Sequence, residues 1–253
     1  MPPEDEHYKE EYANWKAPDS SQEKSEIEQD SKPKDLEKNE KERLWDEVAN
    51  ELEDVGDKRG LGIDEGIKEA VTAFKVNGLN TTQSCEGHVD ESSLSPWVQF
   101  EAPNRPESKF VGEEDKYSEV AGKYGIPVED VKRANNVQAW REVYGYFEGS
   151  GQPTVEFQKW QEDNNKQKER AISFLEDFYT ERLGVDDDVK LVLVESDDSI
   201  RVHNGGENYI VTSELEKLRK EKTKEELTNI LLTRQEEMGN FTKFLKQRFF
   251  NTP

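Results

Sequence analysis

The stretch Leu79-Asn80-Thr81-Thr82-Gln83-Ser84-Cys85-Glu86-Gly87-His88 decides the fold, because it joins a strand to a tight turn that ends in a histidine. A predicted helix before it stops at Gly78, and the β-branched Thr81 and Thr82 then favour a strand from Leu79 to Ser84. Pro96 to Phe100 alternates in polarity and predicts a second strand. Paired with the first, this strand holds the Cys85 turn at its open end.

Two helices are predicted before this strand. The first begins near Asn39, and the glycine-rich segment from Gly56 to Gly62 ends it. Its apolar residues recur at the spacing of one helix face, at Leu44, Trp45, Val48, Leu52 and Val55. Asp64 is expected to cap the second helix, which runs to Gly78.

The C-terminal part of the chain predicts further helices and a three-stranded meander. A long helix follows Pro153 and ends at Gly184, with apolar residues at Phe157, Trp160, Ile172, Leu175, Phe178 and Leu183. The strands are Val189 to Val194, Ile200 to His203 and Tyr209 to Val211. Two capping boxes, Ser213 with Glu216 and Thr223 with Glu226, predict two final helices.

These elements predict an α+β fold in which a mostly antiparallel sheet packs with several helices. Residues 39–111 and 154–253 form this core, residues 1–38 are a disordered acidic N-terminal tail, and residues 112–153 are a helical-hairpin insertion. Within the insertion, the segment from Val120 to Asn136 resembles both a helix-turn-helix and the helical part of LysM modules. A plain hairpin held by Val120, Ile126 and Val131 is favoured.

Composition restricts the class of partner. The 253 residues carry a formal net charge of -22, which opposes binding to DNA, so a protein or small-molecule partner is expected instead. No apolar run approaches the roughly 18 to 20 residues that cross a bilayer, and the N-terminus lacks the features of a signal peptide. With one cysteine and no internal disulfide, the chain is expected to be soluble and cytoplasmic, with no membrane contact.

Cys85 and His88 stand three residues apart in a glycine-containing turn, where side chains can converge on one point. A zinc site would use the Cys85 sulfur and a His88 nitrogen, and His203 with Glu86 or Asp90 could complete it.

Two other interpretations of the turn stay open. Cys85 is a candidate nucleophile if His88 or Arg105 lowers the pKa of its thiol. Alternatively, the turn is purely structural: Ser84 and Cys85 pack beneath it, and Gly87 supplies a positive φ.

The segments Ile63 to Ile67 and Thr81 to His88 resemble the methyltransferase family that acts on the wybutosine precursor in phenylalanine transfer RNA. In that family too, a helix opening with Asp and Ile leads into a Thr-Thr-x-Ser-Cys-x-Gly turn. The resemblance implies that Thr82 to His88 lines a site for S-adenosylmethionine and a modified guanosine. Glu86 and His88 stand where the family has Ser and Arg, so shared architecture is favoured over a shared substrate. The Ser84 to His88 string also resembles short bacterial and phage proteins.

The sequence therefore favours a binding or regulatory module. The alternative is a pocket or enzyme for a nucleotide or polar metabolite, built on the Thr82 to His88 turn, with Glu86 and His88 as acid and base. Its predicted ligand contacts are Thr82, Ser84, Cys85, Gly87, Trp97 and Arg105. Zinc and S-adenosylmethionine are the candidate cofactors.

Overall fold

The computed structural model describes residues 38–56, 62–90, 93–180, 182–196, 198–205 and 212–252. The predicted tail, the middle of the glycine-rich segment and the predicted strand Tyr209 to Val211 lie outside these residues. The described chain divides into two compact units, residues 104–160 and residues 38–103 with 161–252.

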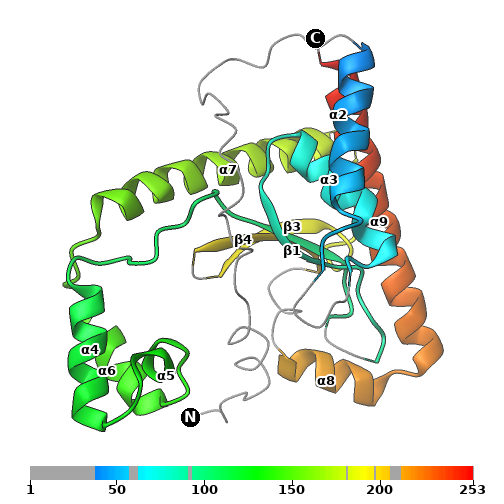
Figure 1. Ribbon diagram of the computed structural model, residues 1–253. Coiled ribbons are helices and arrows are strands. Elements are labelled where there is room, and N and C mark those ends of the chain that lie inside the picture. The colour runs from blue at the N-terminus through cyan, green and yellow to red at the C-terminus, as the bar shows by residue number, and fades with distance from the viewer. Residues whose placement is uncertain are drawn as a thin grey trace. The chain divides into compact units, whose positions relative to one another are not determined.

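The larger unit is built on a four-stranded antiparallel sheet in the order β1-β2-β4-β3 (Figure 1). Its strands are β1 (Thr81–Cys85), β2 (Trp97–Phe100), β3 (Leu191–Ser196) and β4 (Ser199–Asn204). Each begins and ends within two residues of its predicted position, because β-branched residues mark β1 and apolar residues at alternate positions mark the other strands. The predicted α+β class with a mostly antiparallel sheet is confirmed.

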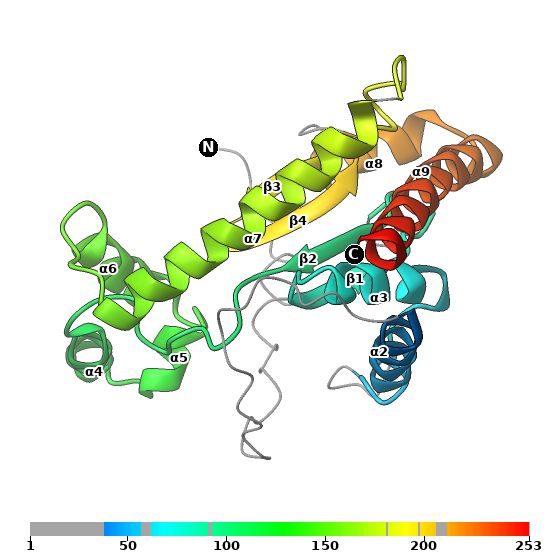
Figure 2. The ribbon, with the colours of Figure 1, turned by 90° about the horizontal axis from the view of Figure 1, so that it is seen from above.

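One face of the sheet forms the main hydrophobic core. Alternate strand residues, including Val98, Phe100, Ile200 and Val202, are at most 2% exposed and pack with residues from four helices. These helices are α2 (Lys38–Glu51), α3 (Lys68–Val76), α7 (Val155–Thr180, whose residues after Trp160 belong to this unit) and α9 (Lys224–Asn251). In Figures 1 and 2, α3 lies along this face, and α9 runs beside it.

The other face of the sheet is polar at its centre. Strand pairing aligns Cys85, Trp97 and His203 in one row, and Gln83, Gln99 and Arg201 in the next. Directly paired residues of antiparallel strands point to the same face, so these six side chains share one surface. Cys85 therefore lies at one end of a polar face of the sheet, opposite the core, and Cys85, Gln99 and His203 are buried on this face.

Two predicted core residues are exposed. Val55 is 46% exposed because α2 ends at Glu51, and Leu183 is 91% exposed because α7 ends at Thr180. Asp64 does not cap with its side chain the short 3-10 helix η1 (Glu65–Ile67) that follows it. The capping box of Thr223 and Glu226 is confirmed at the start of α9. Helix α8 (Thr212–Glu221) precedes it, but the Ser213 side chain lies outside the described residues.

The smaller unit contains α4 (Glu113–Tyr124), α5 (Val128–Lys132), α6 (Val137–Phe147) and the first residues of α7. Val120 and Val131 are buried together, with Ile126 packed against them. The third helix, α6, is absent from the predicted hairpin and begins with an Asn136 cap. An antiparallel bridge between Phe110 and Pro153 brings the two ends of the unit together.

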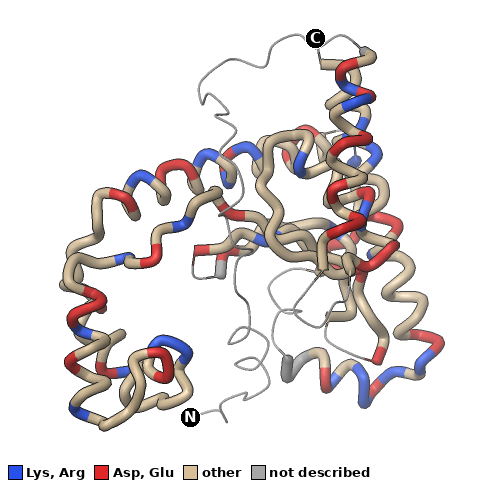
Figure 3. The backbone as a smooth tube through the Cα atoms, viewed as in Figure 1, with Lys and Arg blue, Asp and Glu red and all other residues tan. Residues whose placement is uncertain are grey.

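Charged residues of both signs alternate along the helices, whereas the strands carry few of them (Figure 3). None of the described helices is long and apolar enough to cross a membrane.

Candidate functional site

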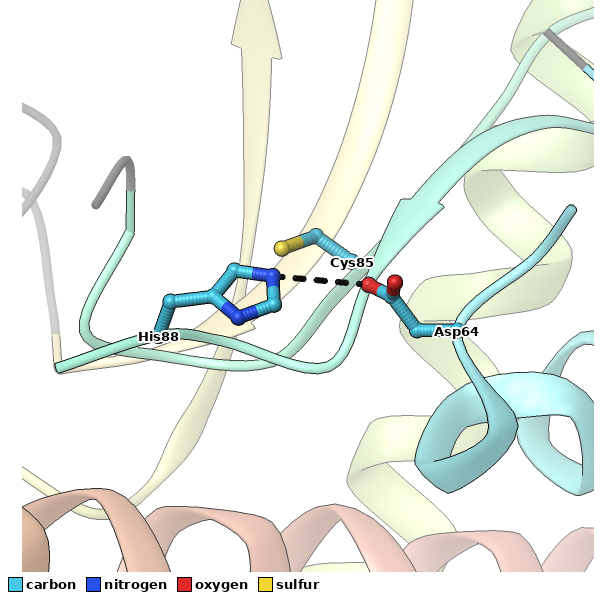
Figure 4. Close-up of side chains that lie close together, drawn as sticks. All are labelled: Asp64, Cys85 and His88. Atoms are coloured by element: carbon cyan, nitrogen blue, oxygen red, sulfur yellow. Dashed lines mark ion pairs between the residues drawn. The ribbon is translucent and has the colours of Figure 1, made fainter. Parts of the chain in front are cut away.

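Asp64, Cys85 and His88 bring three potential metal ligands together at the end of β1 (Figure 4). One ligand atom from each side chain lies within 4.8 Å of the other two. The His88 Nε2 is 3.6 Å from the Asp64 Oδ2. The three residues come from two segments of the chain, so the cluster is made by the fold and not by sequence proximity alone.

Cys85 is the last residue of β1 and is only 8% exposed. Its strand pairing with Trp97 fixes the direction of the side chain. The backbone N–H of Gly87 donates to the Cys85 sulfur at 3.3 Å. Cysteine binds metals through this sulfur, in the thiolate form.

Gly87 gives the turn its shape. Its φ is +85°, in the left-handed region that favours glycine. A Cβ at this position would come within 2.7 Å of Leu231 Cδ1 and 2.9 Å of the backbone carbon of Ser95. The turn is thus packed against α9 and the 93–96 loop. The His88 N–H donates to the Ser93 carbonyl at 2.8 Å, which holds His88 after the turn.

Asp64 reaches the turn through a reciprocal pair of hydrogen bonds. The Glu86 backbone N–H donates to Asp64 Oδ2 at 3.1 Å, and the Gly66 N–H donates to Glu86 Oε2 at 2.9 Å. The side chains of Asp64 and His88 are 35% and 39% exposed, so an ion or ligand can reach them.

The arrangement suits a zinc-class ion. Thiolate sulfur, imidazole nitrogen and carboxylate oxygen are all zinc ligands, with bonds of about 2.0 to 2.3 Å. Ligand atoms around a tetrahedral ion are then about 3.3 to 3.8 Å apart. The separations at this site, 4.8 Å or less, need only small side-chain movements to reach that range. Three protein ligands leave a fourth position for another group.

The orientation of His88 bears on the alternative of a nucleophilic cysteine. Figure 4 shows the Cys85 sulfur and the Asp64 carboxylate at the same edge of the ring, the edge that carries Nε2. In a nucleophile–histidine–carboxylate triad, the nucleophile and the carboxylate contact different ring nitrogens. Convergence on one nitrogen is instead what a shared ion produces.

Other predicted metal ligands lie elsewhere. His203 pairs with Trp97, which in turn pairs with Cys85, so His203 is two strands away from Cys85. Two strand spacings amount to about 9.6 Å, and among the described residues the ligand atoms within 4.8 Å of one another do not include one from His203. The Glu86 carboxylate accepts a hydrogen bond from the Gly66 N–H, and Asp90 forms an ion pair with Lys224 at 2.6 Å. Glu86 and His88, the predicted acid and base, therefore contact different groups: Glu86 accepts from the Gly66 N–H, and His88 lies beside the Asp64 carboxylate.

The predicted ligand-binding residues divide in the same way. Trp97 is beside Cys85 on the polar face, whereas Ser84 pairs with Val98 and faces the core. Thr82 lies at an irregularity in the pairing of β1 with β2, and its buried hydroxyl has no partner among the described residues. Arg105 belongs to the smaller unit, where its guanidinium lies over the Trp160 ring.

Sequence reasoning missed two residues of the site. The sequence predicts Asp64 only as a helix cap. Its position directly before the helical segment that leads into β1 also indicates that Asp64 can lie near this strand. Gln235 of α9 donates from its side chain to the Glu86 carbonyl at 2.9 Å. No sequence pattern indicates that contact, because the two residues are 149 positions apart.

Fold and site together define an α+β protein with three metal-type ligands at the end of a central sheet. No protein-family model matches the chain, and neither curated proteins nor solved structures give a significant match. The resemblance to the wybutosine-related methyltransferases therefore stays a prediction.

Proposed function

We propose that this protein is a metal-dependent binding module whose zinc-class ion is held by Asp64, Cys85 and His88. The observation that supports this is the convergence of three different zinc-ligand types within 4.8 Å. A thiolate and a carboxylate would neutralise the two charges of the ion, so binding leaves little uncompensated charge.

The proposed function depends on the fourth coordination position of the ion. With three protein ligands, the ion retains a place for a donor atom from a small molecule or a protein partner. The polar sheet face next to Cys85, with Trp97 and Gln83, would contact the rest of that molecule. Zinc enzymes keep the same open place for a water molecule, so metal-assisted hydrolysis is the second candidate function.

Cobalt titration tests the proposal directly. The purified protein is stripped with a chelator and titrated with Co²⁺, and zinc is then used to displace the cobalt. We expect one ion per chain, a thiolate-to-cobalt charge-transfer band and the visible bands of four-coordinate cobalt. Cys85→Ser should remove the charge-transfer band, and Asp64→Asn and His88→Gln should each weaken zinc binding by about 100-fold or more.

Asp64→Asn is the most informative variant, because an asparagine oxygen can still accept the Glu86 N–H while the negative charge is lost. Asp90→Asn is its matched control, since Asp90 is an exposed carboxylate paired with Lys224, and it should bind zinc like the wild type. If each of the three ligand variants still bound one zinc ion per chain, the proposed site would be disproved. Failure of the wild type to bind any ion, together with rapid alkylation of Cys85 that depends on His88, would favour a nucleophilic cysteine.

A further inference from the structure

A groove separates the last turns of α7 from the C-terminal half of α9 in the larger unit. Its volume is about 500 Å³, within the range of sites for small organic molecules. Phe178 and Phe244 form its apolar floor, with ring centroids 5.5 Å apart. The α9 residues Asn240, Lys243 and Phe244 recur at helical spacing and present one continuous wall.

The charges around this groove favour an anion. Lys243 is exposed and has no ion pair with any residue that the structure describes. Asp177, the one acidic residue among the described residues that line the groove, is already paired with Arg248 at 2.7 Å. Counting the residues that the structure describes, the groove presents a positive charge with no ion-pair partner, on a chain whose net charge is -22.

Arg182 provides a second donor group. Its guanidinium lies over the Phe178 ring at 4.8 Å and forms an ion pair with the buried Glu237. The Nε of Arg182 is buried and has no acceptor among the described residues. The Arg182 side chain as a whole is 36% exposed, so an anion can reach its guanidinium and accept a charge-assisted hydrogen bond from it.

The wall formed by α7 limits how much negative charge the ligand can carry. Asp177 and Thr180 belong to the last turn of α7, where the helix dipole places a partial negative charge. A doubly charged phosphate would be repelled by this partial charge more strongly than a singly charged carboxylate would be.

We propose that this groove binds a small amphiphilic monocarboxylate. Its ring or chain lies on Phe178 and Phe244, and its carboxylate accepts hydrogen bonds from Lys243 and Arg182. The groove shares no residue with the Asp64–Cys85–His88 cluster, so the proposal does not depend on metal binding.

Fluorescence displacement tests this assignment. 8-Anilinonaphthalene-1-sulfonate, a singly charged aromatic probe, is titrated into the full chain and then displaced with three compounds that share one ring and chain: 4-phenylbutyrate, 4-phenylbutanol and 4-phenylbutylamine. We expect one high-affinity probe site per chain. The carboxylate should displace the probe at concentrations about tenfold or more below those of the alcohol and the amine.

Substitutions locate the site. Lys243→Gln should weaken probe and 4-phenylbutyrate binding about tenfold. Lys217→Gln, on an exposed part of α8, removes the same charge elsewhere and should leave binding unchanged. Circular dichroism verifies that each variant is folded. The proposal is overturned if the wild type does not bind the probe, if the amine competes as well as the carboxylate, or if the two lysine variants behave alike.

Discussion

Gly87 is the residue on which the geometry of the Cys85 to His88 turn depends most directly. Gly87→Ala combines a φ of +85° with a Cβ only 2.7 Å from Leu231 Cδ1, so we expect it to lower the free energy of unfolding by about 1 to 3 kcal/mol. Gly239→Ala is the matched control. Gly239 lies inside α9 with no atom within 4 Å of an added Cβ, so alanine should stabilise the protein by up to about 1 kcal/mol. Urea unfolding compares them, and equal effects would contradict this account of the turn.

The buried His203 side chain is expected to make the protein less stable in mild acid. It is 5% exposed on β4, and burial lowers its pKa from the ordinary value of 6.5. The Asn204 carbonyl, which accepts from Nδ1, opposes this shift, whereas Arg201 and Arg234 add to it. Because the unfolded chain takes up a proton first, the free energy of unfolding should fall as the pH drops below about 6.5 and level off below the folded pKa.

Urea unfolding at about pH 7.5 and about pH 5.5 measures this effect. His203→Gln removes the titrating group, so the difference in stability between the two pH values should be smaller than in the wild type. Carboxylates protonate in both proteins and cancel in the comparison. An equal or larger pH dependence in the variant would show that His203 does not contribute.

At the residue scale, the sequence identified Cys85 and His88 because both stand in one short turn. It could not identify Asp64 as their neighbour. That contact depends on the direction in which α3 leads into β1, and on the Glu86 N–H that holds the carboxylate. The sequence predicts His203 as a third metal ligand because the chain has few histidines. Its distance from Cys85 depends on the order of the strands, which residue type does not reveal.

Among the elements, α9 connects the Cys85 to His88 turn to the main core. Phe241 and Leu245 are buried beneath the sheet, while Gln235 donates to the Glu86 carbonyl at 2.9 Å. We expect Gln235→Ala to weaken zinc binding by up to about tenfold without changing the cobalt spectrum, because Gln235 positions the turn but is not a ligand. Gln247→Ala, exposed on the same helix, should not alter zinc affinity. A changed spectrum in Gln235→Ala would contradict a positioning role.

Element ends were less predictable than element types. The four described strands were recognisable from local sequence, because the β-branched Thr81 and Thr82 mark β1 and apolar residues at alternate positions mark the other three. Val55 and Leu183 continue the apolar helical pattern beyond Glu51 and Thr180, where the helices end. Periodicity alone does not show where the core stops. By contrast, the capping box of Thr223 and Glu226 is a local hydrogen-bonding pattern, and it predicted the start of α9 correctly.

At the scale of the whole molecule, the two units have separate cores. The sheet core includes Val98 and Phe241, whereas the core of the smaller unit contains Val120, Val131 and Val143. No buried residue belongs to both of these clusters. Because cooperativity arises from shared packing, each unit is expected to open locally with its own free energy.

Val143→Ala tests this independence. Val143 is 2% exposed in the core of the smaller unit, so its truncation should cost that unit about 1 to 3 kcal/mol. Hydrogen exchange followed by mass spectrometry should show faster exchange in α4 and α6, while β3 and β4 exchange as in the wild type. Val155→Ala, at a position 77% exposed in the same unit, is the control and should change neither. Equal acceleration in the sheet would mean that the two cores unfold as one cooperative structure.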